Sequence, residues 1–377
     1  MTRDVLIIGL GALGSHILEL IATTPGINNI VCADVRDEEG SEITGCTARG
    51  VAQRGLYPNI EFRKIDLFDV KDTAELLKEL EPRMIINAST LSTWWLPHLL
   101  PVEISHKILK AGLGPWTPTH LTLTYNLMKA LKKSGVEAKI INCSYADAVN
   151  PILARVGLPV TLGGGNLDLL TPRIKMYVAK KLGIPMREVL LFLVCHHGVI
   201  SSVGEAPFYY KIVVRDKDVT SQFSIEEIRK TVPPLYRPAK ALMEAPPQYD
   251  IAQSFVKNAL GVYFNTGELS HSPGPAGLPG GYPVRLTAEP QVVLPEELTL
   301  DEAVRINEHG GRWDGIEKIE DDGTLLVTDE AYNVLKETLN YDCKKFKPEE
   351  TEKRAKELIA CYKDTLKKHR VPMPDWI

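Results

Sequence analysis

The sequence has no apolar run close to the roughly 20 residues that a membrane-spanning helix needs. Its longest apolar runs, such as VLLFLV at residues 189–194, are far shorter. It also lacks long basic runs, and its 377 residues carry a net charge of −4, so we expect neither nucleic acid nor a membrane as a partner. The opening MTRDVLIIGLGALGSH leads directly into a strand without the features of a signal peptide, which predicts a cytoplasmic protein.

Cysteine pairing is also missing. None of the six cysteines forms a CxxC pair, and several lie in apolar runs, where cysteine behaves as a small buried side chain. We therefore expect free thiols in a reducing compartment. Cys195, His196 and His197 are contiguous, but a strand cannot turn three successive side chains onto one ion, so we predict no metal site.

The chain does contain a glycine-rich turn between a strand and a helix. The apolar residues 5–8 precede Gly9, Gly11 and Gly14 at GxGxxG spacing, and an apolar helical period follows. In this motif the first glycine makes the tight turn, the second lets a pyrophosphate approach the backbone, and the third lets the helix pack on the strand. The residues predicted to bind the phosphates of a dinucleotide at this helix N-terminus are Gly9, Gly11, Ala12, Leu13 and Gly14.

A second strand ends at Asp34, twenty residues after Gly14. A carboxylate at this point accepts a hydrogen bond from the ribose 2′-hydroxyl and repels a 2′-phosphate, which favours NAD over NADP as the cofactor. Val35 and Arg36 follow at the edge of the same site. An Arg here can also pair with a 2′-phosphate, so NADP remains an alternative.

Three more apolar strands follow, at residues 60–68, 83–89 and 138–144, with amphipathic helices between them. This alternation predicts a Rossmann fold, a doubly wound parallel sheet that binds its ligand at the carboxyl ends of the strands. The residues expected to border the cofactor at these ends are Asp66, Ala88, Ser89 and Asn142. Asn150, which precedes a proline, is an alternative to Asn142.

The order of elements from residue 142 onward resembles the middle of lactate and malate dehydrogenases. The similar pieces are a polar turn containing Asn, the sequence GGGNLD opening a long helix, KLG closing it, and a strand that ends in His-Gly. Residues 250–260 and 280–293 resemble a long helix and a G-x-P-V strand of that family's substrate domain. The resemblance spans roughly residues 5–310. It implies an NAD-linked dehydrogenase with a Rossmann domain, residues 1–146, and a mixed α/β substrate domain with a helical extension, residues 147–377.

The resemblance also implies a catalytic pair, His197 and Asp168. A hydride can leave an alcohol carbon only if a base takes the hydroxyl proton, and histidine suits this because its ordinary pKa is near 6.5. A carboxylate on the other ring nitrogen fixes the tautomer and stabilises the imidazolium. Because adjacent strand residues point to opposite faces, we expect His196 to do less than His197. We nevertheless include His196 with Asn166 among the candidate substrate-binding residues.

The arginines with which this family holds a substrate carboxylate are missing. Thr171 stands where the resemblance requires the first, and residues 89–118 contain none. Lysine replaces the bidentate arginine fork poorly, so we expect a substrate other than a simple 2-hydroxy acid. The same segment holds Trp94, Trp95 and Trp116, of which Trp95 is our candidate substrate contact. These tryptophans fit an apolar, ring-bearing or polyol substrate, or else a place in the core or in a subunit contact.

Two segments fall outside these motifs. Residues 265–283 are dense in Gly, Pro and Ser, which predicts an ordered but mobile loop with a solvated His271. Residues 315–331 predict a hairpin with an Asp-Gly turn. Residues 348–369 predict an amphipathic helix with a solvated face or a subunit contact.

We conclude that the sequence predicts an NAD-dependent oxidoreductase that acts on a secondary alcohol or its ketone, as a homodimer or homotetramer. One alternative is a C–N dehydrogenase of the opine or saccharopine type. Another is an enzyme that uses tightly held NAD to oxidise a sugar transiently. The last is an NAD sensor without enzymatic activity.

Overall fold

The computed structural model describes residues 3–234 and 248–373. A six-stranded parallel sheet in the order β3-β2-β1-β4-β5-β6 forms the centre of the first half of the chain. Its inner strands are apolar and buried on both faces, as a parallel sheet covered by helices requires. The strands are β1 Val5–Ile8, β2 Asn29–Asp34, β3 Asn59–Lys64, β4 Met84–Asn87, β5 Lys139–Asn142 and β6 Leu162–Gly163.

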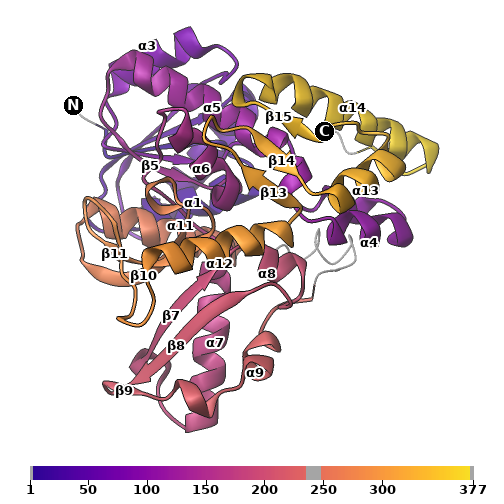
Figure 1. Ribbon diagram of the computed structural model, residues 1–377. Helices are drawn as coiled ribbons and strands as arrows, with labels where there is room; N and C mark the ends of the chain where they lie inside the picture. The colour runs from indigo at the N-terminus through magenta and orange to yellow at the C-terminus, as the bar shows by residue number, and fades with distance from the viewer. Residues whose placement is uncertain (1–2, 235–247, 374–377) are drawn as a thin grey trace.

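Helices cover the two faces of this sheet (Figure 1). They are α1 Ala12–Ala22, α2 Asp37–Gln53, α3 Val70–Leu80, α5 Thr117–Ser134 and α6 Ala146–Arg155. The Rossmann arrangement predicted from the sequence is therefore confirmed. The predicted division at residue 146 does not coincide with the end of this sheet, because β6 adds a sixth parallel strand beside β5.

A second sheet is antiparallel, in the order β10-β11-β7-β8-β9, with β12 paired to β11. Its strands are β7 Val189–Cys195, β8 Phe208–Val214, β9 Lys217–Asp218, β10 Glu268–Pro273, β11 Gly281–Leu286 and β12 Gln291–Val292. In Figure 1 β7 and β8 run through the lower part of the molecule beside α7, Leu167–Leu182. The helices α9 Ile225–Arg229, α11 Gln248–Tyr263 and α12 Leu300–Arg312 complete this half.

The prediction of a mobile loop at residues 265–283 was wrong. The segment contains β10, which pairs with β11 along its whole length. His271 lies in this strand and is buried, and its Nε2 accepts a hydrogen bond from the backbone N–H of Leu193. Glycine and proline at both ends of the segment obscured a short strand with small polar side chains.

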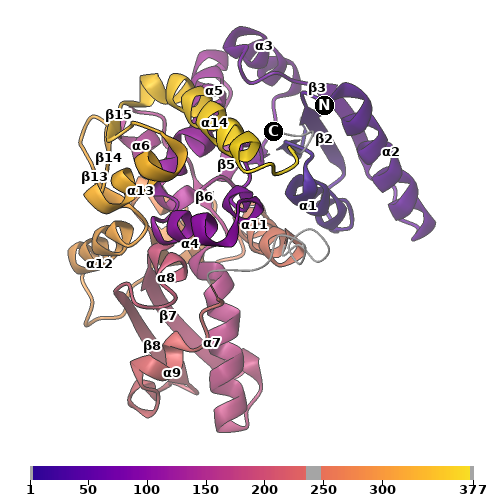
Figure 2. The same ribbon diagram turned by 90° about the vertical axis from the view of Figure 1, so that its right-hand side faces the viewer.

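The C-terminal extension packs on the nucleotide-binding half. It consists of β13 Ile316–Ile319, β14 Leu325–Val327, α13 Asp329–Leu339, β15 Lys345–Phe346 and α14 Thr351–Lys368. The hairpin and the long helix predicted from the sequence are present, and α14 lies along α5 (Figure 2). Leu335 and Leu358 of the extension share one hydrophobic core with Leu121 of α5.

The extension also fixes the segment that follows β4. That segment forms short helical turns, η1 Leu96–Leu99 and η2 Gly114–Trp116, with α4 Val102–Lys110 between them. The Tyr362 hydroxyl donates a hydrogen bond to the carbonyl of Leu96 at 2.6 Å. Trp116 is buried edge-on against Tyr362, so this tryptophan belongs to the core. Within residues 3–234 and 248–373, no helix is both long and apolar enough to cross a bilayer.

Candidate functional site

The glycine-rich turn has the shape that a bound pyrophosphate needs. Gly9 has φ +91°, and a Cβ there would lie 2.8 Å from the backbone N of Ser89. A Cβ on Gly14 would lie 1.8 Å from the carbonyl oxygen of Gly9, whereas one on Gly11 would meet nothing within 4 Å. The following helix α1 starts at Ala12 with neither a side-chain cap nor an acid in its first turn, and its N–H groups remain available to an anion.

Asp34 ends β2 beside this turn, but its carboxylate is already occupied. Oδ2 accepts from the backbone N–H of Leu10 at 2.7 Å and from Arg36 Nη2 at 3.1 Å. Oδ1 accepts from the backbone N–H and the Nε of Arg36 at 2.9 and 3.0 Å. Burial raises the pKa of this carboxyl. The hydrogen bonds from Arg36 and Leu10 lower the pKa by more, so the net pKa lies below the ordinary value.

Asp34 therefore does not have a vacant oxygen for the ribose hydroxyl that the sequence analysis assigned to it. Its role in the structure is to hold the glycine-rich turn against Arg36. Arg36 also donates to Glu39 at 2.6 Å and keeps an exposed face, while Val35 is 55% exposed. These two side chains form the surface at the end of β2.

The residues predicted at the other strand ends differ in how much of their side chain is exposed to solvent. Asp66 is exposed, and its Oδ1 accepts from the N–H of Phe68. Ser89 donates through Oγ to Asn87 at 2.6 Å, and Ala88 is partly buried beside it. Both lie against Gly9, at the carboxyl ends of β1 and β4.

Asn142 is a structural residue in this fold, so its predicted role as a cofactor contact was wrong. It is completely buried, and its amide donates to the carbonyl of Ser144 at 3.0 Å and to Asn150 Oδ1 at 2.9 Å. Its oxygen accepts from the N–H of Ser144 and the hydroxyl of Thr124. Asn150, the alternative, is equally buried, and it also donates to the carbonyl of Gly274.

His197 lies just beyond the end of β7, where the chain turns into a short helix, α8 Gly198–Ser201. Its backbone is helical, so the alternation of strand side chains does not apply at this position. Gly198 allows the turn, because a Cβ there would lie 2.1 Å from the carbonyl oxygen of Gly310 in α12. This close approach places the end of α12, and the residues after it, beside the histidine.

The charge partner of His197 is Asp314. The Nδ1 atom of His197 lies 2.8 Å from Asp314 Oδ2, and the side chain is 19% exposed. Its backbone N–H donates to Asp147 Oδ1, also at 2.8 Å. No hydrogen-bond partner of Nε2 lies within the described parts of the chain, and this leaves Nε2 as the nitrogen that can meet a ligand.

Asp314 is fully buried and accepts four hydrogen bonds. Its donors are the backbone N–H of Leu113, the hydroxyls of Ser201 and Tyr145, and the ring of His197, at 2.9, 2.5, 2.5 and 2.8 Å. Burial alone raises the pKa of this carboxyl, but the charge and hydrogen bond of His197 lower it, and the net pKa lies well below the usual range. Burial lowers the pKa of His197, but Asp314 raises it more, so the net pKa is raised above 6.5.

The predicted pair of Asp168 with His197 was wrong. Asp168 starts α7 as expected, but its carboxylate faces α11, where it accepts from Lys257 Nζ at 2.7 Å and from Ser254 Oγ. The resemblance located the residue correctly but could not give the direction of its side chain. Asp314 was missed because it lies just beyond the part of the chain that the resemblance covers. The only local signal was a single Asp between Trp313 and Gly315 at a helix end.

The three predicted substrate-binding residues differ in burial and in hydrogen bonding. His196 is buried with a 3% exposed side chain, its Nδ1 accepts from the N–H of Gly198, and burial lowers its pKa, so a substrate contact is not supported for it. Asn166 donates to the carboxylate of Asp147, the group that also holds the backbone of His197. Trp95 is half-buried at the start of η1.

Tyr145 also belongs to the cluster around Asp314, and the sequence analysis did not identify it. Besides its bond to Asp314, its ring lies edge-on to His197 at 5.7 Å, to His196 at 6.4 Å and to His120 at 6.0 Å between centroids. Its backbone is left-handed, with φ 43°, a strained conformation for tyrosine that is typical of functional sites. Among residues 3–234 and 248–373, no group of three or more His, Cys, Asp or Glu side chains is arranged to hold a metal ion.

Comparisons with known proteins support the fold. No protein-family model and no curated protein matches the sequence. A lactate dehydrogenase structure from Eimeria maxima, with NADH and oxamate, matches with a TM-score of 0.59 and 13% identity over 83% of this chain and 92% of that one. The minor L-lactate dehydrogenase of Enterococcus mundtii matches with a TM-score of 0.54 and 17% identity over 82% and 96%. The malate dehydrogenase of Aeropyrum pernix gives 0.55 and 14% over 82% and 95%. The chain therefore has the fold of lactate and malate dehydrogenases.

The first prediction concerns the two acids. In Asp314→Asn the pKa of His197 should fall by roughly 1–3 pH units, because an opposite charge within hydrogen-bond distance is lost while burial remains. Asp168→Asn, the matched control, should leave this pKa unchanged. The measurement is a ¹⁵N NMR titration of the histidine side chains, and an equal shift in both variants would contradict the assignment.

Removing a partner from a buried ion pair also destabilises the fold, by about 3–5 kcal/mol. Urea unfolding of Asp314→Asn therefore accompanies the titration. If that variant does not fold, Tyr145→Phe provides the second test. It keeps the charge of Asp314 and removes one neutral donor, so the pKa of His197 should remain raised.

Proposed function

We propose that the protein is an NAD-dependent dehydrogenase that oxidises a secondary alcohol or reduces the corresponding ketone, with His197 as the acid/base. The observation that carries the proposal is the pairing of His197 Nδ1 with the buried carboxylate of Asp314, which leaves Nε2 directed away from that partner. A histidine held in this way has a defined tautomer and a raised pKa. Both properties suit a group that takes and returns a proton near neutral pH.

The chemistry is balanced between the cofactor and this histidine. The NAD that the glycine-rich turn would hold would supply the acceptor for the hydride of the carbinol C–H bond. His197 Nε2 takes the hydroxyl proton as the carbonyl forms, and Asp314 stabilises the resulting imidazolium. In the reverse direction the imidazolium returns the proton to the carbonyl oxygen. The hydrogen bond between Asp147 and the backbone N–H of His197 keeps the imidazole in position.

The glycine-rich turn fits the cofactor. The open space beside Gly11 and the uncapped start of α1 suit the pyrophosphate. The structure of the similar Eimeria maxima enzyme holds NADH. At the end of β2, where the ribose would lie, the charge is mostly negative. Asp37, Glu38 and Glu39 form the first turn of α2, and Arg36 is already paired with Asp34 and Glu39. This charge disfavours the 2′-phosphate of NADP.

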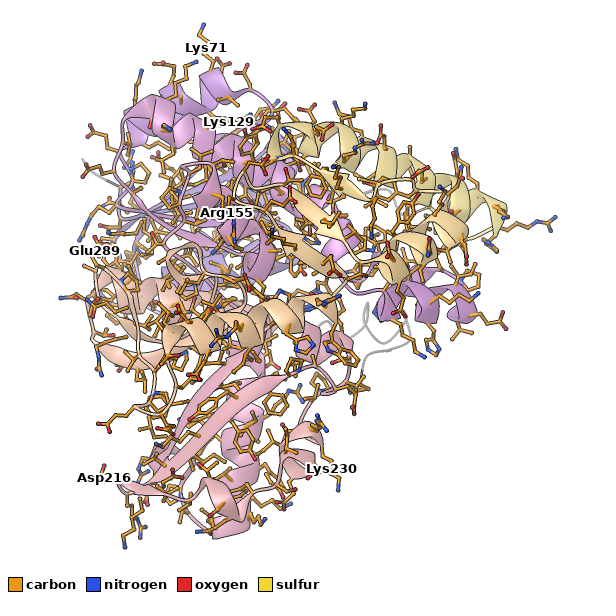
Figure 3. All side chains as sticks on the ribbon, in the orientation of Figure 1. Lys71, Lys129, Arg155, Asp216, Lys230 and Glu289 are labelled. Atoms are coloured by element: carbon orange, nitrogen blue, oxygen red, sulfur yellow. The ribbon has the colours of Figure 1, made fainter. Side chains whose placement is uncertain are left out.

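The substrate is proposed to be other than a simple 2-hydroxy acid. Thr171, at the position of the expected arginine, bonds back to the carbonyl of Leu167. Arg155 lies at the far end of α6 from Tyr145, where it donates to the carbonyl of Pro151 (Figure 3). In the described parts of the chain, none of the hydrogen bonds or ion pairs of His197, Asp314, Asp147 and Tyr145 involves an Arg or Lys.

The second prediction separates folding from cofactor binding. Gly11→Val should fold normally, because a Cβ at this position meets no neighbour, but it should weaken NADH binding by at least about 10-fold by filling the space for the pyrophosphate. NADH fluorescence titration and thermal unfolding measure the two effects. Gly50→Val is the control, since its added Cβ is also unobstructed but lies in the last turn of α2, far from the glycine-rich turn in the sequence. Unchanged NADH affinity in Gly11→Val would exclude the proposed cofactor site.

The third prediction concerns the choice between NAD and NADP. The double variant Glu38→Gln, Glu39→Gln should bind NADPH roughly 2- to 10-fold more tightly than the wild type, with a larger effect at low salt, because negative charge near the 2′-phosphate is removed. The control variant Glu42→Gln, one turn further along α2, should change the affinity for NADPH less. A wild-type protein that binds NADPH better than NADH would show that Arg36 dominates this surface.

The fourth prediction tests the acid/base. His197→Asn should retain NADH affinity and lose turnover by roughly 10²–10⁴-fold. His309→Asn, an exposed histidine of α12, should behave as wild type. Alcohol oxidation needs neutral His197, whose pKa is raised above 6.5, so the wild-type rate should increase as pH rises through a midpoint above 6.5. Ketone reduction needs the imidazolium and should decrease over the same interval.

The assay is NADH formation with a panel of secondary alcohols, polyols and hydroxy acids, and NADH consumption with the corresponding ketones. Lactate and malate should be poor substrates, since a carboxylate lacks a bidentate partner. No turnover with any member of the panel in either direction would contradict a dehydrogenase. Full activity of His197→Asn would place the proton transfer on another group.

A further inference from the structure

His120 is a buried histidine that the proposed reaction does not yet use. It lies in the first turn of α5 and is 5% exposed. Its Nδ1 is 2.9 Å from the Ser144 hydroxyl oxygen and 3.3 Å from that of Thr90. Its Nε2 is buried and has no hydrogen-bond partner in the described parts of the chain. Native proteins rarely leave such an atom unpaired, so it calls for a partner outside this chain.

The position of His120 connects it to the reaction centre. Thr90 follows β4 and Ser144 follows β5, so the ring sits at the carboxyl edge of the parallel sheet, where ligands of this fold class bind. The His120 ring meets the ring of Tyr145, and Tyr145 also meets the ring of His197. One tyrosine therefore separates the unpaired imidazole nitrogen from the proposed acid/base.

The charge state of His120 restricts what it can bind. Burial lowers its pKa to about 4, His197 lowers it as well, and Asp314 opposes this only in part. The ring is therefore neutral at physiological pH, and each nitrogen either donates or accepts a hydrogen bond according to the tautomer. A neutral imidazole among the hydroxyls of Ser144 and Thr90 suits an alcohol group and gives no charge to a carboxylate.

Resting on the proposed function, we propose that His120 Nε2 hydrogen-bonds a second hydroxyl group of the substrate, while His197 Nε2 contacts the hydroxyl that is oxidised. The substrate class is then a neutral diol or polyol. Ser144 and Thr90 position the ring through Nδ1. The ring of Tyr145 packs against both imidazoles, which places the two proposed contacts on either side of one residue.

The test is equilibrium binding to the protein–NADH complex, measured by NADH fluorescence. The probes are cyclohexanol, cyclohexane-1,2-diol and cyclohexane-1,3-diol, which share one ring and differ in the second hydroxyl. Wild-type protein should bind at least one diol roughly 3- to 10-fold more tightly than cyclohexanol, the range expected for one added neutral hydrogen bond.

Two variants of His120 test whether Nε2, and not Nδ1, binds the second hydroxyl group. In His120→Asn the shorter amide lies near the Nδ1 position and can still bond Ser144, but nothing replaces Nε2, so the preference for the diol should disappear. In His120→Gln the amide reaches the Nε2 position, so the preference should persist at least in part. Cyclohexanol should bind equally to all three proteins. Thermal unfolding checks that both variants fold.

A measurement on unaltered protein keeps the test valid if a variant does not fold. The ¹⁵N signal of His120 Nε2 should shift on addition of the diol and not on addition of cyclohexanol. A wild-type protein without a diol preference, a preference that survives in His120→Asn, or an unmoved ¹⁵N signal would overturn the proposal. Diol binding through His120 without NAD turnover would contradict the proposed function alone, and turnover independent of His120 would contradict this inference alone.

Discussion

The buried carboxylate of Asp314 is the group on which the arrangement of the site depends. A charge removed from water must be compensated by hydrogen bonds and an opposite charge, or it is very costly. Here the four donors come from four segments: the turn after α4, the start of α6, the turn after β7, and α8. Satisfying one carboxylate therefore fixes these segments relative to one another, and His197 is among them.

The need to satisfy the carboxylate of Asp314 also involves the chain that leads into the C-terminal extension. Asp314 lies between α12 and β13, and the chain around it passes very close to the segment that follows β4. A Cβ on Gly112 would lie 2.3 Å from the carbonyl carbon of Asp314, and the N–H of Gly114 donates to its carbonyl oxygen. Tyr362 of α14 holds an earlier part of the same segment through its hydrogen bond to the carbonyl of Leu96. The turn that leads into the extension thus supplies the charge partner of His197, and α14 fixes the segment that borders the strand ends.

The parts of this structure that could be predicted from the sequence are the short-range ones. The three glycines, the strand before them and the helix after them act within one turn of chain, so their spacing is sufficient. The location of His197 at the end of a strand could also be predicted, because the strand that precedes it and the glycine that follows it are local. Asp314 is 117 residues further along the chain, and no local pattern encodes that contact. Asn142 was misjudged for the same reason, since burial of an amide among four partners depends on tertiary packing.

The different surroundings of Asp168 and Asp314 explain why only one of them can raise the proton affinity of a histidine. Asp168 is compensated by the ammonium group of Lys257, so its charge is already balanced. The donors to Asp314 from Leu113, Ser201 and Tyr145 are neutral, which leaves His197 to provide the positive charge. His196 is also near, with Nδ1 3.8 Å from Asp314, but that nitrogen accepts the N–H of Gly198 and so carries no proton to give. The histidine that follows β7 therefore obtains its carboxylate partner from the turn after α12 and not from the start of α7, and a site in this chain must be argued from contacts and not from fold alone.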